Sequence, residues 1–319
     1  MGYGIGGYLR MEKQSAFGTP VSSSPFYIPF VSENLVENKN YLQIENLKNL
    51  YDAPDDLQGV NNVTGDIVFE PHPIYLGHFL RGCLGANPTS TLATSAYVHE
   101  FLPTQVEFAE NCTLPPYTIQ IFKNVGSAYQ IADAQIHTLA IELTAGEIVK
   151  CTATVHGRAY SKVAKATPSY ITADPYAWNT ASLSIDGVAN SAFETATITF
   201  ENPIEGITAL NASTNEARLL RSDFRAITVA GDQSFENQAQ EAEFRDGAQQ
   251  RFLFTLKGAA IGASFQTLTM DFPKVRYNTF EYPIAGPGRI TAAYEGKASY
   301  DTTSSYAARV TLTNTLAAY

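Results

Sequence analysis

A six-residue frame occurs twice in this chain, first as Gly65-Asp66-Ile67-Val68-Phe69-Glu70 and again as Gly231-Asp232-Gln233-Ser234-Phe235-Glu236. The identical positions are Gly65, Asp66, Phe69 and Glu70 in the first copy and Gly231, Asp232, Phe235 and Glu236 in the second. Segments that recur within one chain are the mark of an internal repeat. We therefore expect the two frames to occupy equivalent places in two copies of one folding unit.

Residues around the two frames support the same interpretation. The Glu-Asn pairs at 33–34 and 201–202 lie 32 and 30 residues before the frame glycines. Downstream of the frames, Gly157 and Gly296 each precede a tyrosine by three or four residues. Because these landmarks recur in the same order, the sequence predicts a tandem duplication.

The length of 319 residues suits about two domains on the usual prior of roughly 100–200 residues each. We place the first at residues 1–165 and the second at 166–319, with the segment 161–174 as the connection. The first copy is the longer one, and most of its excess lies at about 86–116. We interpret that segment as an inserted loop of mixed polarity.

Alternation of apolar and polar residues dominates the chain and predicts half-buried antiparallel strands. Clear examples are the segments 117–121, 139–143, 149–155, 252–256, 268–272 and 308–312. Only two segments have helical character. The first carries its apolar residues on one face, namely Leu76, Phe79, Leu80, Cys83 and Leu84, before Gly85, and the second spans about 237–245. The expected fold is mainly β, with one helix in each copy.

The charge of the chain excludes some classes of function. A net charge of -10 opposes binding to nucleic acid, since affinity for phosphate backbones comes mainly from lysine and arginine. Charged residues make up only 16% of the chain, against a usual value of about 25%. We interpret this deficit as surface that an assembly buries, and the alternative is an unusually neutral monomer.

Metal, cofactor and membrane sites have no sequence signature here. Cys83, Cys112 and Cys151 are odd in number and lack the spacing of a disulfide framework or a zinc site, which fits a reducing compartment. The histidines at 72, 78 and 99 do not have metal-ligand spacing. No signal peptide or apolar span is evident. We expect a soluble protein made in the cytoplasm, with no cofactor.

The frame carboxylates are candidates for catalysis because paired carboxylates can act as acid and base. However, no further matched polar residues accompany Glu70 and Glu236 apart from the frame aspartates. Asp66 and Asp232 follow glycines and suit turns in which the carboxylate binds backbone amides. We therefore interpret the frames as structural.

One family combines these features in the same order. The chain resembles the tail tube proteins of long-tailed, non-contractile bacteriophages. The residues that carry the resemblance are the N-terminal segment with Phe17-Gly18-Thr19-Pro20, the Glu33-Asn34-Leu35 segment, the first frame with its helix to Leu80, and Phe200-Glu201-Asn202 leading to the second frame. The resemblance spans nearly the whole chain. It implies two tandem β-sandwich or barrel domains, each with a flanking α-helix, whose sheets join around a lumen.

The resemblance also implies an assembly. Single-domain relatives form hexameric rings, so three duplicated chains would make a trimeric ring, and stacked rings would form the tube through which DNA passes without specific binding. The implied partners are other copies of the chain, the tape measure protein, the tail terminator and the distal tail proteins, within the virion.

Two long polar loops are our candidates for contacts between rings, because loops beyond about 12–15 residues usually bind something. They lie at 36–56 and 205–219. Their candidate residues are Asn38, Tyr41, Leu42, Ile44, Leu47, Leu50, Asn211, Asn215 and Arg218.

Two other functions remain open at this point. A tandem β-sandwich that binds carbohydrate or a receptor would show exposed aromatic residues clustered on loops, whereas the only tryptophan, Trp178, lies near the connection between the copies. A hydrolase that uses Glu70 or Glu236 is the third alternative.

Overall fold

The computed structural model describes residues 2–284 and 286–319. The elements of the first half are β1 (Tyr8–Lys13), β2 (Phe26–Ile28), β3 (Ser32–Glu33), β4 (Val36–Leu42), β5 (Leu57–Phe69), α1 (Leu76–Leu84), β6 (Thr89–Ala93), β7 (Ala96–Phe101), β8 (Tyr117–Phe122), β9 (Ala128–Thr144), β10 (Lys150–Gly157) and β11 (Ala159–Val163). The fold is mainly β, as the alternation predicts.

The second half begins after an extended segment at 164–177. Its elements are β12 (Ala181–Ile185), β13 (Val188–Asn190), β14 (Thr195–Glu201), β15 (Ile204–Ile207), β16 (Arg218–Arg221), β17 (Ala226–Ser234), α2 (Ala239–Asp246), β18 (Gln250–Ile261), β19 (Ser264–Glu281), β20 (Thr291–Ala298) and β21 (Arg309–Asn314). Short 3-10 helices at Gly4–Gly6 and Trp178–Thr180 complete the described chain.

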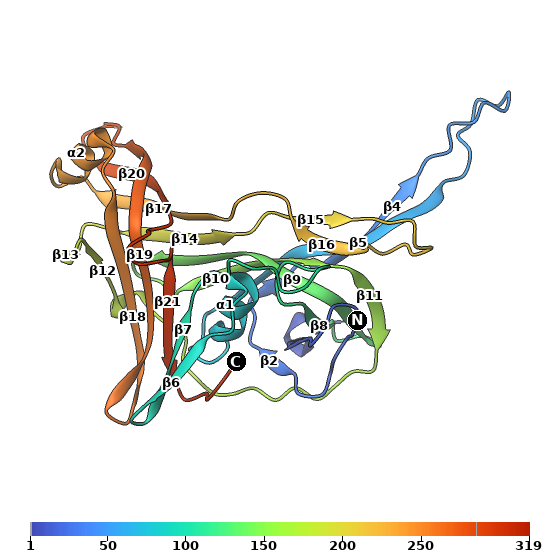
Figure 1. The fold of residues 1–319 in the computed structure, drawn as a ribbon, viewed down its shortest axis with the longest axis horizontal. Helices are drawn as coiled ribbons and strands as arrows, with labels where there is room; N and C mark the ends of the chain where they lie inside the picture. The colour runs from blue at the N-terminus through green and yellow to red at the C-terminus, as the bar shows by residue number, and fades with distance from the viewer. Residues whose placement is uncertain (1, 285) are drawn as a thin grey trace.

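One antiparallel sheet runs through both halves of the molecule (Figure 1). In the first half its neighbours are β5, β10 and β9, and in the second half they are β14, β17, β20, β19, β18 and β12. The halves join where β9 pairs with β14, with Ile141 opposite Ile198 and Leu139 opposite Phe200. Backbone hydrogen bonds therefore connect the two halves of the chain directly.

Strand β9 also belongs to a smaller sheet with β8, β11, β1 and β2. The strand changes sheets near Asp133, whose φ of 56° is in the left-handed region that aspartate tolerates. The buried carboxylate of Asp133 accepts hydrogen bonds from Arg158 Nε at 2.7 Å and from the Gly18 amide at 2.6 Å. These bonds fix the bend and attach the N-terminal segment to it.

The strand arrangement around the first frame recurs around the second. Strand β10 lies between β5 and β9, and β20 lies between β17 and β19. The register also agrees, because Gly157 lies opposite Val63 and Gly296 lies opposite Val229, each valine two residues before its frame glycine. The two frames thus occupy corresponding positions in the sheet.

The upstream Glu-Asn pairs are not equivalent, contrary to expectation. Glu33 lies opposite Ile67, two residues after the frame glycine, whereas Glu201 lies opposite Ala226, five residues before it. Their similar sequence offsets are a coincidence, because the connection from this strand to the frame strand differs in length between the halves.

The expected inserted loop contains a β-hairpin that joins the other half. Strands β6 and β7 pair with each other, and β7 then pairs with β21, with Phe101 opposite Val310. The insertion therefore extends the sheet of the second half rather than its own.

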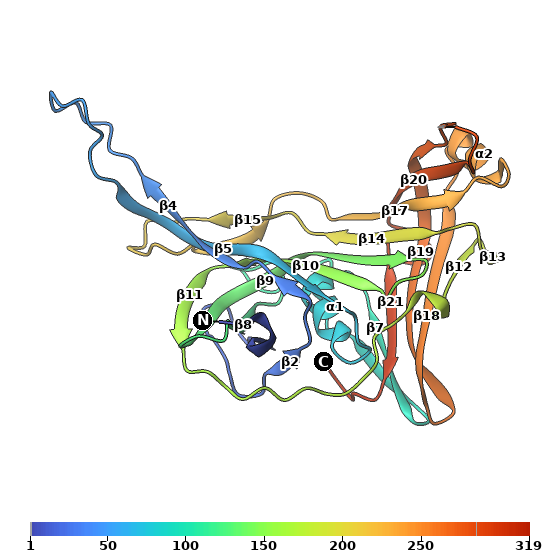
Figure 2. The ribbon, with the colours of Figure 1, turned by 180° about the vertical axis from the view of Figure 1, so that it is seen from behind.

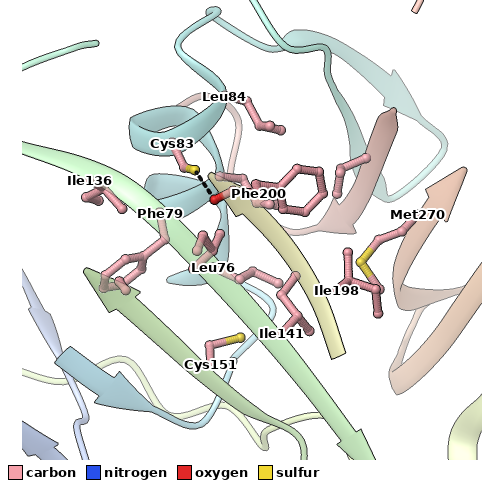
Figure 3. Close-up of a cluster of buried hydrophobic side chains, with 14 of the residues drawn as sticks. Leu76, Phe79, Cys83, Leu84, Ile136, Ile141, Cys151, Ile198, Phe200 and Met270 are labelled. Carbon is pink, nitrogen blue, oxygen red and sulfur yellow. Dashed lines mark hydrogen bonds between the residues drawn. The ribbon is translucent and has the colours of Figure 1, made fainter. Parts of the chain in front are cut away.

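One hydrophobic core extends across both halves, and α1 lies at its centre (Figure 3). The apolar face predicted for this helix is fully buried, and Gly85 ends the helix with a φ of 83°. Helix α1 packs beneath the junction of β9 and β14, where it meets Ile141, Ile198 and Phe200. Helix α2 is more exposed, with Glu241 its one buried residue.

Strand β8 differs from the expected half-buried pattern. Thr118 and Gln120 are as buried as the apolar residues beside them. Gln120 accepts a hydrogen bond from Arg10 Nε at 2.8 Å, and Thr118 Oγ1 accepts one from the Val21 amide at 2.9 Å. The N-terminal segment covers this face and satisfies its polar groups.

Candidate assembly surfaces

Each frame glycine lies where the neighbouring segment of the chain passes very close. A Cβ atom on Gly65 would overlap the carbonyl oxygen of Asn34, and one on Gly231 would overlap the carbonyl oxygen of Thr195. Close approach of backbone to backbone is a position that favours glycine. The glycines recur because the same strand contact recurs.

The frame aspartates lie inside strands β5 and β17, so the expected turns at these positions are wrong. The Asp66 amide donates to Asn34 Oδ1, and Asp66 Oδ1 accepts a bond from Thr154 Oγ1 at 2.7 Å. In the second copy the Asp232 amide donates to Thr195 Oγ1 at 2.8 Å. In both frames a side chain from the neighbouring segment accepts a hydrogen bond from the aspartate amide, which holds that segment beside the frame strand.

The phenylalanine of each frame stacks on an aromatic ring that lies later in the chain. Phe69 is fully buried and stacks on Phe79 of α1, with ring centroids 4.1 Å apart. Phe235 is partly buried and stacks on Tyr282 at 4.7 Å.

The frame glutamates differ in their surroundings. Glu70 is half-buried and Glu236 is exposed. Because one is partly covered and the other is open to solvent, the two glutamates do not share one environment.

The first candidate loop is a long β-hairpin formed by β4 and β5, which we call the arm (residues 36–69). It extends well beyond the body of the molecule in both views (Figures 1 and 2). Its apolar residues are largely exposed, with Leu47 at 102%, Leu50 at 73% and Tyr41 at 58%. Leu42 is also exposed, Ile44 is half-buried, and Asn38 donates to Thr64 Oγ1 at 2.8 Å. Exposed apolar residues grouped on one projection mark an interaction surface.

The second candidate loop connects β15 and β16 and lies beside the base of the arm. The Asn61 amide of β5 donates to the Thr214 carbonyl at 2.6 Å, and Asn215 forms a bridge with Asn61. Asn211 and Arg218 are exposed. The structure thus brings the two candidate loops together, although they are far apart in the sequence.

A buried glutamate holds the two loops in contact. Glu216, 4% exposed, receives a hydrogen bond from Asn62 Nδ2 at 2.9 Å and lies 2.7 Å from His156 Nε2. These partners come from β5 and β10, so Glu216 attaches the loop of the second half to the sheet of the first. A buried carboxylate requires such partners.

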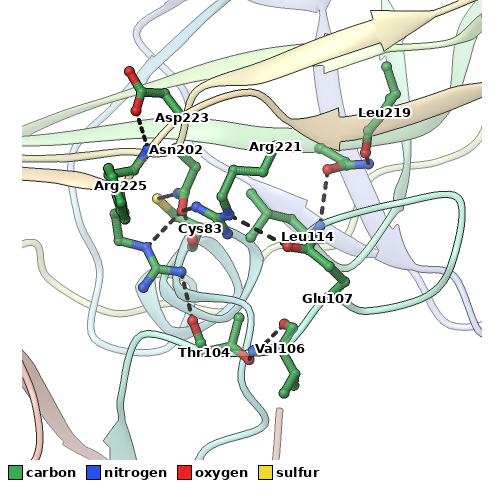
Figure 4. A network of polar contacts seen from close by, with 12 residues as sticks. Cys83, Thr104, Val106, Glu107, Leu114, Asn202, Leu219, Arg221, Asp223 and Arg225 are labelled. Atoms are coloured by element: carbon green, nitrogen blue, oxygen red, sulfur yellow. Dashed lines mark hydrogen bonds and ion pairs between the residues drawn. The ribbon is translucent and has the colours of Figure 1, made fainter.

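A pocket that the sequence did not indicate lies between residues 104–107 and 221–225 (Figure 4). Asn202 Oδ1 accepts hydrogen bonds from Arg225 Nε at 2.8 Å and from Arg221 at 3.1 Å. Burial, together with the nearby Arg221, lowers the pKa of Arg225 to about 10. Guanidinium groups of this kind bind carboxylates and phosphates.

The three cysteines are buried free thiols. Burial raises the pKa of Cys83 to about 12, and its Sγ lies 3.6 Å from the Phe200 carbonyl. Cys83 is therefore a core residue, as its helical spacing predicts. Across residues 2–284 and 286–319, no group of three histidine, cysteine or acidic side chains is arranged to hold a metal ion. Neither described α-helix is long and apolar enough to span a membrane.

Comparison with known proteins identifies the family. The model of the phage tail tube protein family matches residues 4–298, which is nearly the whole chain. A comparison with curated proteins gives no match. The family is structural rather than enzymatic, and its members are components of the virion tail. Because that model covers nearly the whole chain, this chain belongs to the phage tail tube protein family.

Proposed function

We propose that this chain polymerises into stacked rings that form the tail tube, the conduit for DNA during ejection. The observation that carries the proposal is the repeated register of the two frames within one continuous sheet, in a chain that the tail tube family model covers. Because each chain supplies two copies of one strand arrangement, three chains would give a ring with pseudo-sixfold symmetry. The two units correspond to residues 1–165 and 166–319.

Contacts between rings are assigned to the arm and to the loop at 205–219. Both are long, and they lie side by side with exposed apolar residues. Burying such side chains against another ring would remove apolar surface from water and stabilise the contact by about 25 cal/mol for each Å² buried. The tape measure protein, the tail terminator and the distal tail proteins would contact the lumen and the ends of the tube.

The charge of the chain suits passage of DNA. With a net charge of -10, a tube of this protein would repel the phosphate backbone rather than bind it. The DNA would therefore move through the lumen without specific contacts.

Electron microscopy of the purified protein tests the proposal. We expect tubes or stacked rings, with three chains per ring by native mass spectrometry. A variant in which residues 43–56 are replaced by a short turn should keep the circular dichroism of the wild type but form no tubes. Persistent monomers of the wild type would overturn the proposal, and six chains per ring would overturn the trimer.

A further inference from the structure

Both edges of strand β9 are paired with other strands, and each edge pairs with two strands in succession. Ile131 pairs with Ile119 of β8 on one side and with Tyr160 of β11 on the other. Ile141 pairs with Cys151 of β10 and with Ile198 of β14. Because β10 runs directly into β11, these two strands share one edge. Strands β8 and β14 therefore follow each other along the opposite edge.

Strand β19 has the corresponding neighbours except one. Val275 pairs with Gln250 of β18 and with Ala298 of β20, so β18 and β20 lie on opposite edges. Beyond Val275, β20 continues to pair as far as Glu281. No strand of the described chain pairs with the other edge of residues 276–281, which is the place that β14 takes along β9.

Strand β4 has a matching unpaired edge. Asn34 binds Asp66, and Thr195 binds Asp232, so β4 stands in the first half where β14 stands in the second. Strand β14 pairs with both β17 and β9. Within residues 2–284 and 286–319, β4 pairs with β5 alone.

These two edges cannot meet within one chain. Figures 1 and 2 both place β4 and β19 at opposite ends of the molecule. An unpaired strand edge is a ready template for another chain, which proteins either protect or use for assembly. Head-to-tail contacts of this kind generate a ring when the rotation closes.

We infer that the free edge of β19 in one chain pairs with β4 of the next chain, reproducing the junction of β9 and β14. The inference rests on the proposed function and names the surfaces that close the ring. Within the chain, Glu201 lies opposite Thr138, and the matching strand positions place Asn40 opposite Glu281 of the neighbour.

The helices agree with this assignment. Helix α1 packs beneath the junction of β9 and β14. Helix α2 takes the corresponding place beside β19. Tyr277 Oη of β19 donates a hydrogen bond to Gln240 Oε1 of α2 at 2.8 Å, and the ring centroids of Phe244 and Phe280 are 6.3 Å apart. Because the neighbouring chain would supply the strand beside it, α2 remains exposed in the isolated subunit and would be covered in the ring.

A pair of engineered cysteines tests the contact. Asn40 and Glu281 are exposed, and the native cysteines are buried, so an Asn40→Cys/Glu281→Cys variant offers two accessible thiols. Mild oxidation of its tubes should give dimers and trimers on a denaturing gel, with no longer ladder. A mixture of the two single variants should stop at dimers. The matched control, Asn40→Cys/Lys257→Cys, should give no product, because Lys257 is opposite Thr267, far along β19 from Glu281.

Hydrogen exchange of the unmodified protein provides a second measurement. Amides of residues 36–40 and 276–281 should exchange more slowly in the tube than in the subunit. Wild-type tubes that show no protection there, or double-cysteine tubes without cross-links, would overturn the edge pairing while leaving the proposed function intact. Failure of the wild type to form rings or tubes would overturn both.

Discussion

At the scale of single residues, the close approach of the neighbouring backbone explains why glycine occupies the first position of each frame. Gly65 and Gly231 face carbonyl oxygens that a Cβ atom would overlap. We expect Gly65→Ala and Gly231→Ala each to reduce the free energy of unfolding by about 1–3 kcal/mol, the usual cost of overpacking. Urea denaturation would measure this loss. Gly288→Ala is the matched control, since nothing lies near its Cβ position, and an equal loss in the control would contradict the explanation.

His78 predicts a dependence of stability on acid pH. Its ring stacks on Phe26 with centroids 3.5 Å apart, and burial, with a smaller effect of Arg81, lowers its pKa to about 3. A group whose pKa is depressed in the folded state contributes stability above its unfolded pKa and loses it as pH falls. The relevant window therefore extends from about pH 6.5 down to about pH 3.

The variant His78→Phe isolates this contribution. Phenylalanine keeps a ring against Phe26 but binds no proton. Between pH 7 and pH 5 the wild type should lose about 2 kcal/mol more of its unfolding free energy than the variant, since one pKa unit corresponds to about 1.4 kcal/mol. Denaturant titrations at the two pH values would show the difference. Parallel losses in both proteins would mean that His78 is not responsible.

At the scale of elements, local patterns predict the helices and strands well. The spacing from Leu76 to Leu84 predicts α1 and its buried face, and the alternation at 252–256 predicts the buried phenylalanines of β18. Pairings between distant elements are different. Nothing near residues 96–101 indicates that β7 pairs with β21, because such a pairing depends on the whole sheet rather than on local periodicity.

The same limit applies to the candidate surfaces. The arm could be predicted because fourteen residues between β4 and β5 lack a clean period. The burial of Thr118 and Gln120, and the pocket around Arg225, could not. Both depend on which segments cover a face after folding, which the order of polar and apolar residues does not encode.

Limited proteolysis tests the arm as an element. Lys48 lies at its tip between exposed leucines, and exposed loop tips are preferred sites of cleavage. Trypsin should cut the isolated subunit first after Lys48, whereas assembled tubes should resist at least tenfold longer if another ring covers the tip, about 1.4 kcal/mol of protection. A Lys48→Gln variant identifies the site by losing the early fragments. Equal cleavage rates in subunit and tube would place the arm outside the contacts between rings.

At the scale of the whole molecule, the two halves of the chain are not separate bodies. The junction of β9 and β14 joins the halves by backbone hydrogen bonds, and the insertion of the first half completes the sheet of the second through β7 and β21. The hydrophobic core is also shared. The junction of β9 and β14 thus fixes the relative orientation of the two halves of the chain.

This continuity predicts that the isolated subunit unfolds as one cooperative unit. Opening either half would expose the shared apolar residues around α1, such as Ile141 and Phe200, so partly folded forms should be poorly populated. Calorimetry should therefore give a single transition with a ratio of calorimetric to van't Hoff enthalpy near one. A substitution at the junction, Ile198→Ala, should lower the midpoint of that single transition, with a loss of about 2–5 kcal/mol, because it leaves a cavity between the halves. Two resolved transitions, with only one of them shifted by the substitution, would show that the copies fold independently and that the junction adds little to the stability of the chain.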